Sequence, residues 1–82
     1  MMNDASPPVH DFDAGELGCG TGLPGEVRRR LAALPIGERL RIATRDPSAR
    51  EDLPALARLL GQRVVAVDPA GDTTIITVER TR

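Results

Sequence analysis

The chain has 82 residues, a formal net charge of −1 and 40% hydrophobic residues, which suits one small domain with a modest core. The near-neutral charge argues against nucleic acid or an acidic membrane surface as a direct partner, because both attract strongly basic proteins. The sequence has no lysine, which excludes Schiff-base chemistry, and one cysteine, which excludes an internal disulfide. Neither a secretory signal nor a stretch of about 18 apolar residues is present, so we expect a cytoplasmic protein with a reduced thiol.

The first quarter of the chain is polar and rich in glycine. Residues 1–9 include a proline pair and predict a disordered tail, which leaves residues 10–82 as a single domain. Residues 10–17 carry a short, mixed pattern that weakly favours a first strand. Residues 18–25 (GCGTGLPG) contain four glycines and a proline and predict a loop.

Two helices are predicted from apolar residues at helical spacing. Val27, Leu31 and Leu34 define the first helix, which Pro35 ends. The second helix opens at residues 46–48 (Asp-Pro-Ser), where the spacing from serine to Glu51 is that of a capping box. Its apolar stripe consists of Leu53, Leu56, Ala57 and Leu60. A proline inside the pattern, Pro54, should kink or split this helix.

Three further strands follow from alternation and turn residues. Residues 38–44 (ERLRIAT) place Leu40, Ile42 and Thr44 on one side, as in a half-buried strand. Residues 63–68 and 73–80 form two more strands, and the turn at residues 69–72 (PAGD) predicts an antiparallel hairpin.

The predicted order is therefore β-α-β-α-β-β. Right-handed crossovers put both helices on one face of a four-stranded mixed sheet, which gives a two-layer α/β (α+β) sandwich with one sheet face uncovered. On the last strand we expect Ile76 and Val78 to face the helices and Ile75 to lie on the open face.

Several local motifs in this layout resemble the TusA/SirA/YedF family of bacterial sulfur carriers. Residues 13–19 (DAGELGC) look like the family's Asp-x-x-Gly-Leu segment before its sulfur-carrying cysteine. Residues 35–38 (PIGE) resemble its Pro-Gly-Glu turn, with one residue inserted. The Asp-Pro pair at 46–47 and the Asp-Leu-Pro at 52–54 resemble the start of its second helix. The family's Cys-Pro-x-Pro motif is replaced here by Cys-Gly-Thr-Gly.

The resemblance implies a sulfur carrier in which Cys19 relays sulfur as a persulfide between donor and acceptor proteins. The donor would be a cysteine desulfurase or a rhodanese-like protein, and no cofactor would be needed. If active, the chain would be a sulfurtransferase-type carrier, and we expect a monomer or weak dimer. A position before a helix lowers a thiol pKa, and the backbone around Gly20, Thr21 and Gly22 suits an anion-binding nest. The run Arg28, Arg29 and Arg30 is a candidate docking surface for an acidic partner.

Other interpretations of the same residues remain open. Cys19 can also be interpreted as a small buried apolar side chain, and a third interpretation is a redox switch that forms intermolecular disulfides. The three arginines suit an ordinary solvated helix face. His10, Asp11 and Asp13 precede the cysteine, but with no second cysteine or histidine they are a poor metal site, and we predict none. The main alternative function is a non-catalytic interaction module that keeps the fold and uses the open sheet face or the arginine-bearing helix.

Overall fold

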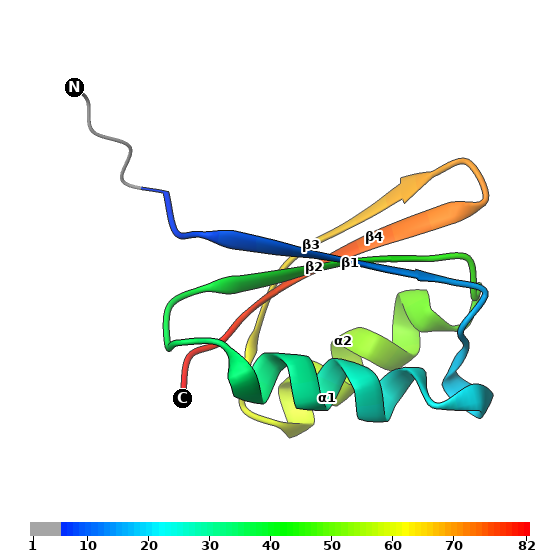
Figure 1. The fold of residues 1–82 in the computed structure, drawn as a ribbon. Coiled ribbons are helices and arrows are strands. Elements are labelled where there is room, and N and C mark those ends of the chain that lie inside the picture. The colour runs from blue at the N-terminus through cyan, green and yellow to red at the C-terminus, as the bar shows by residue number, and fades with distance from the viewer. Residues whose placement is uncertain (1–5) are drawn as a thin grey trace.

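The computed structural model describes residues 6–82 and has the predicted two-layer architecture (Figure 1). Both helices lie against one face of a four-stranded sheet, and the other face is uncovered. Most of the predicted tail, residues 1–9, lies outside the described residues. Its last residue, Val9, belongs to the sheet, where it pairs with Arg39.

The chain order of the regular elements is β-α-β-α-β-β, with a short 3-10 turn before the first helix. The elements are β1 (Val9–Gly15), η1 (Cys19–Thr21), α1 (Leu23–Ala33), β2 (Arg39–Thr44), α2 (Ala49–Leu59), β3 (Arg63–Ala70) and β4 (Thr73–Glu79). The spatial order of the strands is β1-β2-β4-β3. β1 and β2 are parallel and the other two pairings are antiparallel, so the sheet is mixed as predicted.

The core lies between the sheet and the helices and contains almost no aromatic side chains. Leu40, Ile42 and Thr44 of β2 are all buried, which confirms the predicted alternation. Ile76 and Val78 of β4 are also buried under the helices, as expected. The helices contribute the remaining large apolar side chains of the core: Leu23, Val27, Leu31, Leu34 and Leu53.

Some element boundaries differ from the sequence prediction. β1 covers Val9–Gly15, so it ends two residues before the end of the predicted segment 10–17. α1 begins at Leu23 with Gly22 as its N-cap, so the last residues of the glycine-rich segment 18–25 are helical. β3 runs on to Ala70, so the hairpin turn is shorter than predicted. α2 is one continuous helix with Pro54 inside it and is not split; this proline is buried against the core.

The C-terminal end of each helix is closed by a different device. α2 ends in a Schellman motif, in which Gly61 (φ +77°) donates to Arg58 O and Gln62 donates to Ala57 O. α1 is closed by a side chain from the end of the chain, because the Arg80 guanidinium donates to the carbonyls of Ala32 and Leu34. A cation at this position also suits the negative end of the helix dipole.

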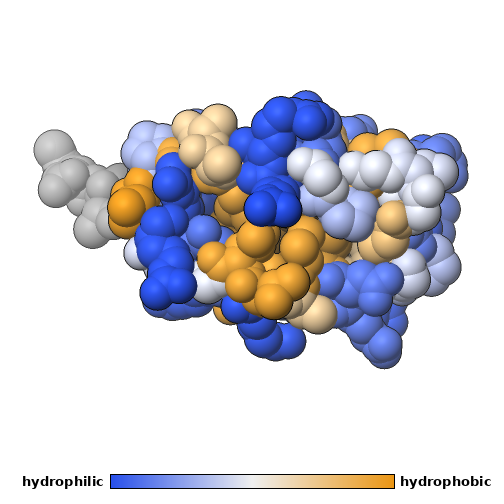
Figure 2. Space-filling view, turned by 90° about the horizontal axis from the view of Figure 1, so that it is seen from below, coloured by the Kyte–Doolittle hydropathy of each residue, from blue (hydrophilic) through white to orange (hydrophobic). Residues whose placement is uncertain are grey.

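The outer surface of the helix layer is mixed in polarity. Figure 2 shows apolar side chains gathered there among polar ones. Leu59 of α2 is 82% exposed, the largest exposure among the large apolar side chains of residues 6–82. No helix within residues 6–82 has the length and apolar character needed to cross a membrane.

Replacing Arg80 by alanine should lower the free energy of unfolding by about 1–2 kcal/mol, because two α1 carbonyls lose a charged donor. The matched control is Arg28→Ala on α1, whose exposed side chain forms no ion pair within residues 6–82; it should change stability by less than about 0.5 kcal/mol. Urea unfolding of both variants measures the difference. Equal effects would show that Arg80 does not close the helix.

Candidate functional site

The single cysteine sits in the turn that connects the first strand to the first helix. Cys19 is the first residue of η1, is half-buried, and packs against the edge of the core. Gly22 links η1 to α1 with a φ of +106°, a left-handed conformation that favours glycine. The thiol is thus neither enclosed in the aliphatic interior nor fully exposed.

The carboxylate of Asp46 fixes the position of this turn. The Cys19 backbone N–H donates to Asp46 Oδ2 at 2.8 Å. The other oxygen, Oδ1, accepts from the Ser48 N–H at 3.0 Å and from its hydroxyl at 2.9 Å. A Cβ added at Gly18 would lie 3.0 Å from Asp46 Oδ2, so glycine permits this close approach. One side chain therefore connects the β1–α1 loop with the β2–α2 loop.

The predicted supporting residues lie in the same turn. Thr21 closes it, because its Oγ1 accepts from the Gly18 N–H at 2.8 Å and its own N–H donates to Gly18 O. Gly20 is exposed, and a Cβ there would meet no atom within 4 Å. The turn is therefore ordered by Thr21 on one side and Asp46 on the other, with an open surface at Gly20.

The surroundings of the thiol are acidic. Burial is the largest cause that raises the pKa of Cys19, and the side chains of Asp52 and Asp46 raise it further. A hydrogen bond from Ser48 opposes them and lowers the pKa. The net direction is upward, opposite to the direction expected from a helix N-terminus alone. The resting form at neutral pH is therefore the thiol, since burial and two nearby carboxylates disfavour the thiolate.

Ser48 has a different role from the predicted one. It occupies the N-cap position of α2, but its side chain makes no capping hydrogen bond to the helix. The hydroxyl donates to Asp46 instead. Because a hydroxyl carries one proton, Ser48 cannot donate to Asp46 and to the Cys19 sulfur at the same time. The predicted capping box is therefore wrong, and this serine belongs to the surroundings of the cysteine.

The three consecutive arginines lie on the exposed side of α1 and differ in their contacts. Arg29 and Arg30 both form ion pairs with Glu26, one turn earlier on the same helix. The Arg30 guanidinium also lies over the ring of Phe12, 3.9 Å from its centroid. Arg28 is exposed and has no such ion pair among the described residues. Two of the three charges are therefore partly neutralised within the protein.

The histidine and aspartates that precede the cysteine in sequence contact other partners. His10 Nε2 lies 2.7 Å from Glu38 Oε1, and Asp11 forms a bidentate pair with Arg41. Asp13 accepts from the Gly15 N–H. Within residues 6–82, no group of three or more histidine, cysteine, aspartate and glutamate side chains is arranged to hold a metal ion.

Comparison with known protein families identifies the family of this chain. A family model described as sulfurtransferase TusA matches residues 25–80, which is more than half of the chain. The chain belongs to the sulfurtransferase TusA family. Membership suggests a sulfur-carrier role for the protein. The match begins at Gly25, so Cys19 and its glycine-rich turn lie outside the matched segment of this TusA-family chain.

The sequence points to Cys19 as the candidate site residue but does not reveal the acidic groups that surround it. The spacing of Asp46 and Asp52 places them at the start of α2, and nothing in it shows that they also face the cysteine. The Asp-Pro pair was the available signal, because it marks a fixed loop at the end of β2. β1 and β2 are adjacent and parallel, so the loops that follow them emerge at the same edge of the sheet.

Asp52→Asn should lower the pKa of Cys19 and raise its rate of alkylation by iodoacetamide at pH 7, because one carboxylate near the sulfur loses its charge. Wild-type Cys19 should react more slowly than free cysteine at the same pH. The control is Glu51→Gln, which removes the same charge at the neighbouring exposed position and should leave the rate unchanged. The rates are measured by intact mass; equal acceleration in both variants would contradict a local effect of Asp52.

Asp46 should make folding sensitive to acid. Hydrogen bonds from Cys19 and Ser48 lower the pKa of Asp46 below its value in the unfolded chain, so its stabilising contribution is present above about pH 4 and is lost as the pH falls through the folded-state pKa. The Tm difference between wild type and Asp46→Asn should therefore be largest near pH 7 and shrink below about pH 4. A difference that does not vary with pH would contradict the assignment.

Proposed function

We propose that this TusA-family protein carries sulfur as a persulfide on Cys19 and relays it between two partner proteins. The observation that supports the proposal best is the fixed position of the only thiol. Cys19 is half-buried, and its backbone is bound to Asp46 of the Asp-Pro pair. A carrier needs a thiol that is ordered yet reachable by a large partner, and the turn provides both.

The chemistry is an exchange of one sulfur–sulfur bond for another. The Cys19 sulfur, once deprotonated, attacks the terminal sulfur of the donor's persulfide. The new bond forms to Cys19, the old bond breaks, and its electron pair leaves with the donor cysteine as a thiolate. In the second transfer, a thiolate of the acceptor attacks the terminal sulfur of the Cys19 persulfide, and Cys19 leaves as a thiolate. No external oxidant or reductant enters either transfer.

The acidic surroundings determine how the first step would begin. Burial, together with Asp52 and Asp46, keeps the thiol protonated at rest. This also limits its reaction with oxidants, since the thiolate is the reactive form. Attack therefore requires the thiol proton to leave, and a neighbouring carboxylate or water would accept it. A docked partner that pairs with these carboxylates would lower the thiol pKa and couple binding to reactivity.

The remaining predicted site residues keep supporting roles in this proposal. Gly20, Thr21 and Gly22 would present the open side of the turn to the bound persulfide. Arg28 is the member of the arginine run that is best placed for an acidic partner, since Glu26 already pairs with the other two. We expect the donor to be a cysteine desulfurase or rhodanese-like protein, and the cytoplasm to be the compartment where the thiol stays reduced.

Incubation with a cysteine desulfurase and cysteine should add about 32 Da, one sulfur atom, to the intact mass. The adduct should be absent in Cys19→Ala and should disappear from the wild type after treatment with dithiothreitol. Glu38→Gln, which changes a carboxylate just before β2 at the end of the sheet away from the turn, is the control and should still be loaded. No adduct with several donors would contradict the carrier function and favour a non-catalytic interaction module. A Cys19-dependent dimer on a non-reducing gel would instead indicate a redox switch.

A further inference from the structure

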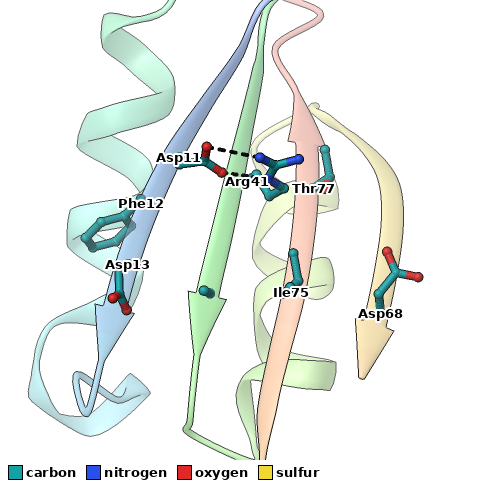
Figure 3. A pocket seen from close by; sticks show the side chains of 8 residues that line it. Asp11, Phe12, Asp13, Arg41, Asp68, Ile75 and Thr77 are labelled. Carbon is teal, nitrogen blue, oxygen red and sulfur yellow. Dashed lines mark hydrogen bonds and ion pairs between the residues drawn. The ribbon is translucent and has the colours of Figure 1, made fainter. Parts of the chain in front are cut away.

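The uncovered face of the sheet is not flat: it carries a concavity of about 550 Å³ (Figure 3). Its lining comes from all four strands and comprises Asp11, Phe12, Asp13, Arg41, Ala43, Asp68, Ile75 and Thr77. Ile75 lies here, as the alternation of β4 predicted. No other element of residues 6–82 covers this face.

One row of side chains runs straight across the concavity. The strand register pairs Asp13 with Ala43, Ala43 with Ile75, and Ile75 with Asp68. Residues directly opposite one another in neighbouring strands point to the same side of a sheet. We call these four residues the acidic row: it has a carboxylate at each end and two half-buried apolar side chains in the middle. Figure 3 shows Asp13 and Asp68 on opposite sides of Ile75.

The neighbouring row is different because its charges are satisfied internally. Asp11 pairs with Arg41 at 2.6 and 3.0 Å, and the guanidinium lowers the pKa of Asp11. The next residue across the sheet is Thr77. Neither carboxylate of the acidic row has such a cation within residues 6–82: Asp13 accepts only a backbone N–H, and Asp68 is exposed with no ion pair.

The spacing of the acidic row matches that of an extended peptide. Asp13 on β1 and Asp68 on β3 are three strand spacings apart. At roughly 4.8 Å between neighbouring strands, the distance across the sheet between them is about 14 Å. Residues i and i+4 of an extended chain are also about 13–14 Å apart and point to the same side, with residue i+2 midway between them. A segment crossing the strands would thus place two side chains over the carboxylates and one over Ala43 and Ile75.

We propose that the open sheet face docks an extended partner segment with the pattern basic–x–apolar–x–basic. The two cations pair with Asp13 and Asp68, and the central apolar side chain covers Ala43 and Ile75. The charge of the face selects this occupant. Its four ionisable residues, three aspartates and one arginine, have a net charge of −2. This charge disfavours an anionic partner. It also disfavours a dimer in which two such faces meet, since their combined charge would be −4.

This docking surface is separate from the cysteine. Its residues lie along the strands, whereas Cys19 lies in the turn beyond the end of β1 and faces the start of α2. Segment binding therefore does not depend on sulfur transfer, and Cys19→Ala should bind as the wild type does. The surface would hold a partner by its basic segment irrespective of what the thiol carries.

The probe is a synthetic peptide, acetyl-Gly-Arg-Ser-Val-Ser-Arg-Gly-amide, titrated into the full-length ¹⁵N-labelled protein. We expect amide shifts on the acidic row and weaker binding as salt increases. A peptide of the same composition with adjacent arginines should bind several-fold more weakly, because its charges cannot reach both carboxylates. Shifts on α1 and α2 instead, or no binding by either peptide, would overturn the proposal.

Paired charge variants separate specific docking from general attraction. The double variant Asp13→Asn, Asp68→Asn should bind the peptide about three- to tenfold more weakly, since it loses two exposed ion pairs and each contributes modestly. The control Glu16→Gln, Glu51→Gln removes the same charge at exposed positions outside the row and should bind nearly as tightly as the wild type. If the two double variants lost peptide affinity equally, the proposal would be overturned. It would also be overturned if sedimentation showed that the protein self-associates through this face and that the peptide does not displace the second copy.

Discussion

The hydrogen bonds of Asp46 hold together the part of the molecule where chemistry is expected. One carboxylate oxygen binds the Cys19 N–H and the other binds Ser48. The cysteine turn and the start of α2 are separated by more than twenty residues in sequence, and this side chain connects them directly. Gly18 completes the arrangement, because any side chain there would press against the carboxylate. The position of the thiol is thus decided by an acidic residue, which also shapes its reactivity.

The two faces of the sheet differ in composition because helices cover only one of them. The even-numbered residues of β2 and β4 build the core with the helices, and the cysteine turn packs at its edge. The odd-numbered residues remain on the open face, where carboxylates flank an apolar centre. A small domain with one core can therefore present a thiol at the end of the sheet and a separate binding surface across it. Mutations on the open face should leave the core intact, which makes the two proposed functions separable by experiment.

The fold was largely predictable and the site only partly so. Alternation in β2 and β4 and the stripes of α1 and α2 were sufficient to place both helices on one face, since crossover handedness leaves few arrangements. Two local interpretations failed for tertiary reasons. Pro54 was predicted to kink or split α2, and the split does not occur, because the ring is buried and tertiary packing holds the helix together around it. Ser48 does not cap its helix, because its hydroxyl finds a closer acceptor in Asp46.

By itself, the sequence determined the order of the elements, the apolar residues of the core, and Cys19 as the only thiol, because these follow from residue type and from short-range periodicity. The tertiary structure alone decided which charges surround that thiol and which residues form the acidic row. Both depend on strand order: β1 lies beside β2, which brings Asp46 to Cys19, and β4 lies between β2 and β3, which lines up Asp13, Ala43, Ile75 and Asp68. Burial and electrostatic interactions both depend on the tertiary structure, so the pKa of Cys19 is raised first by its burial and further by carboxylates far away in the chain, once the strands have paired.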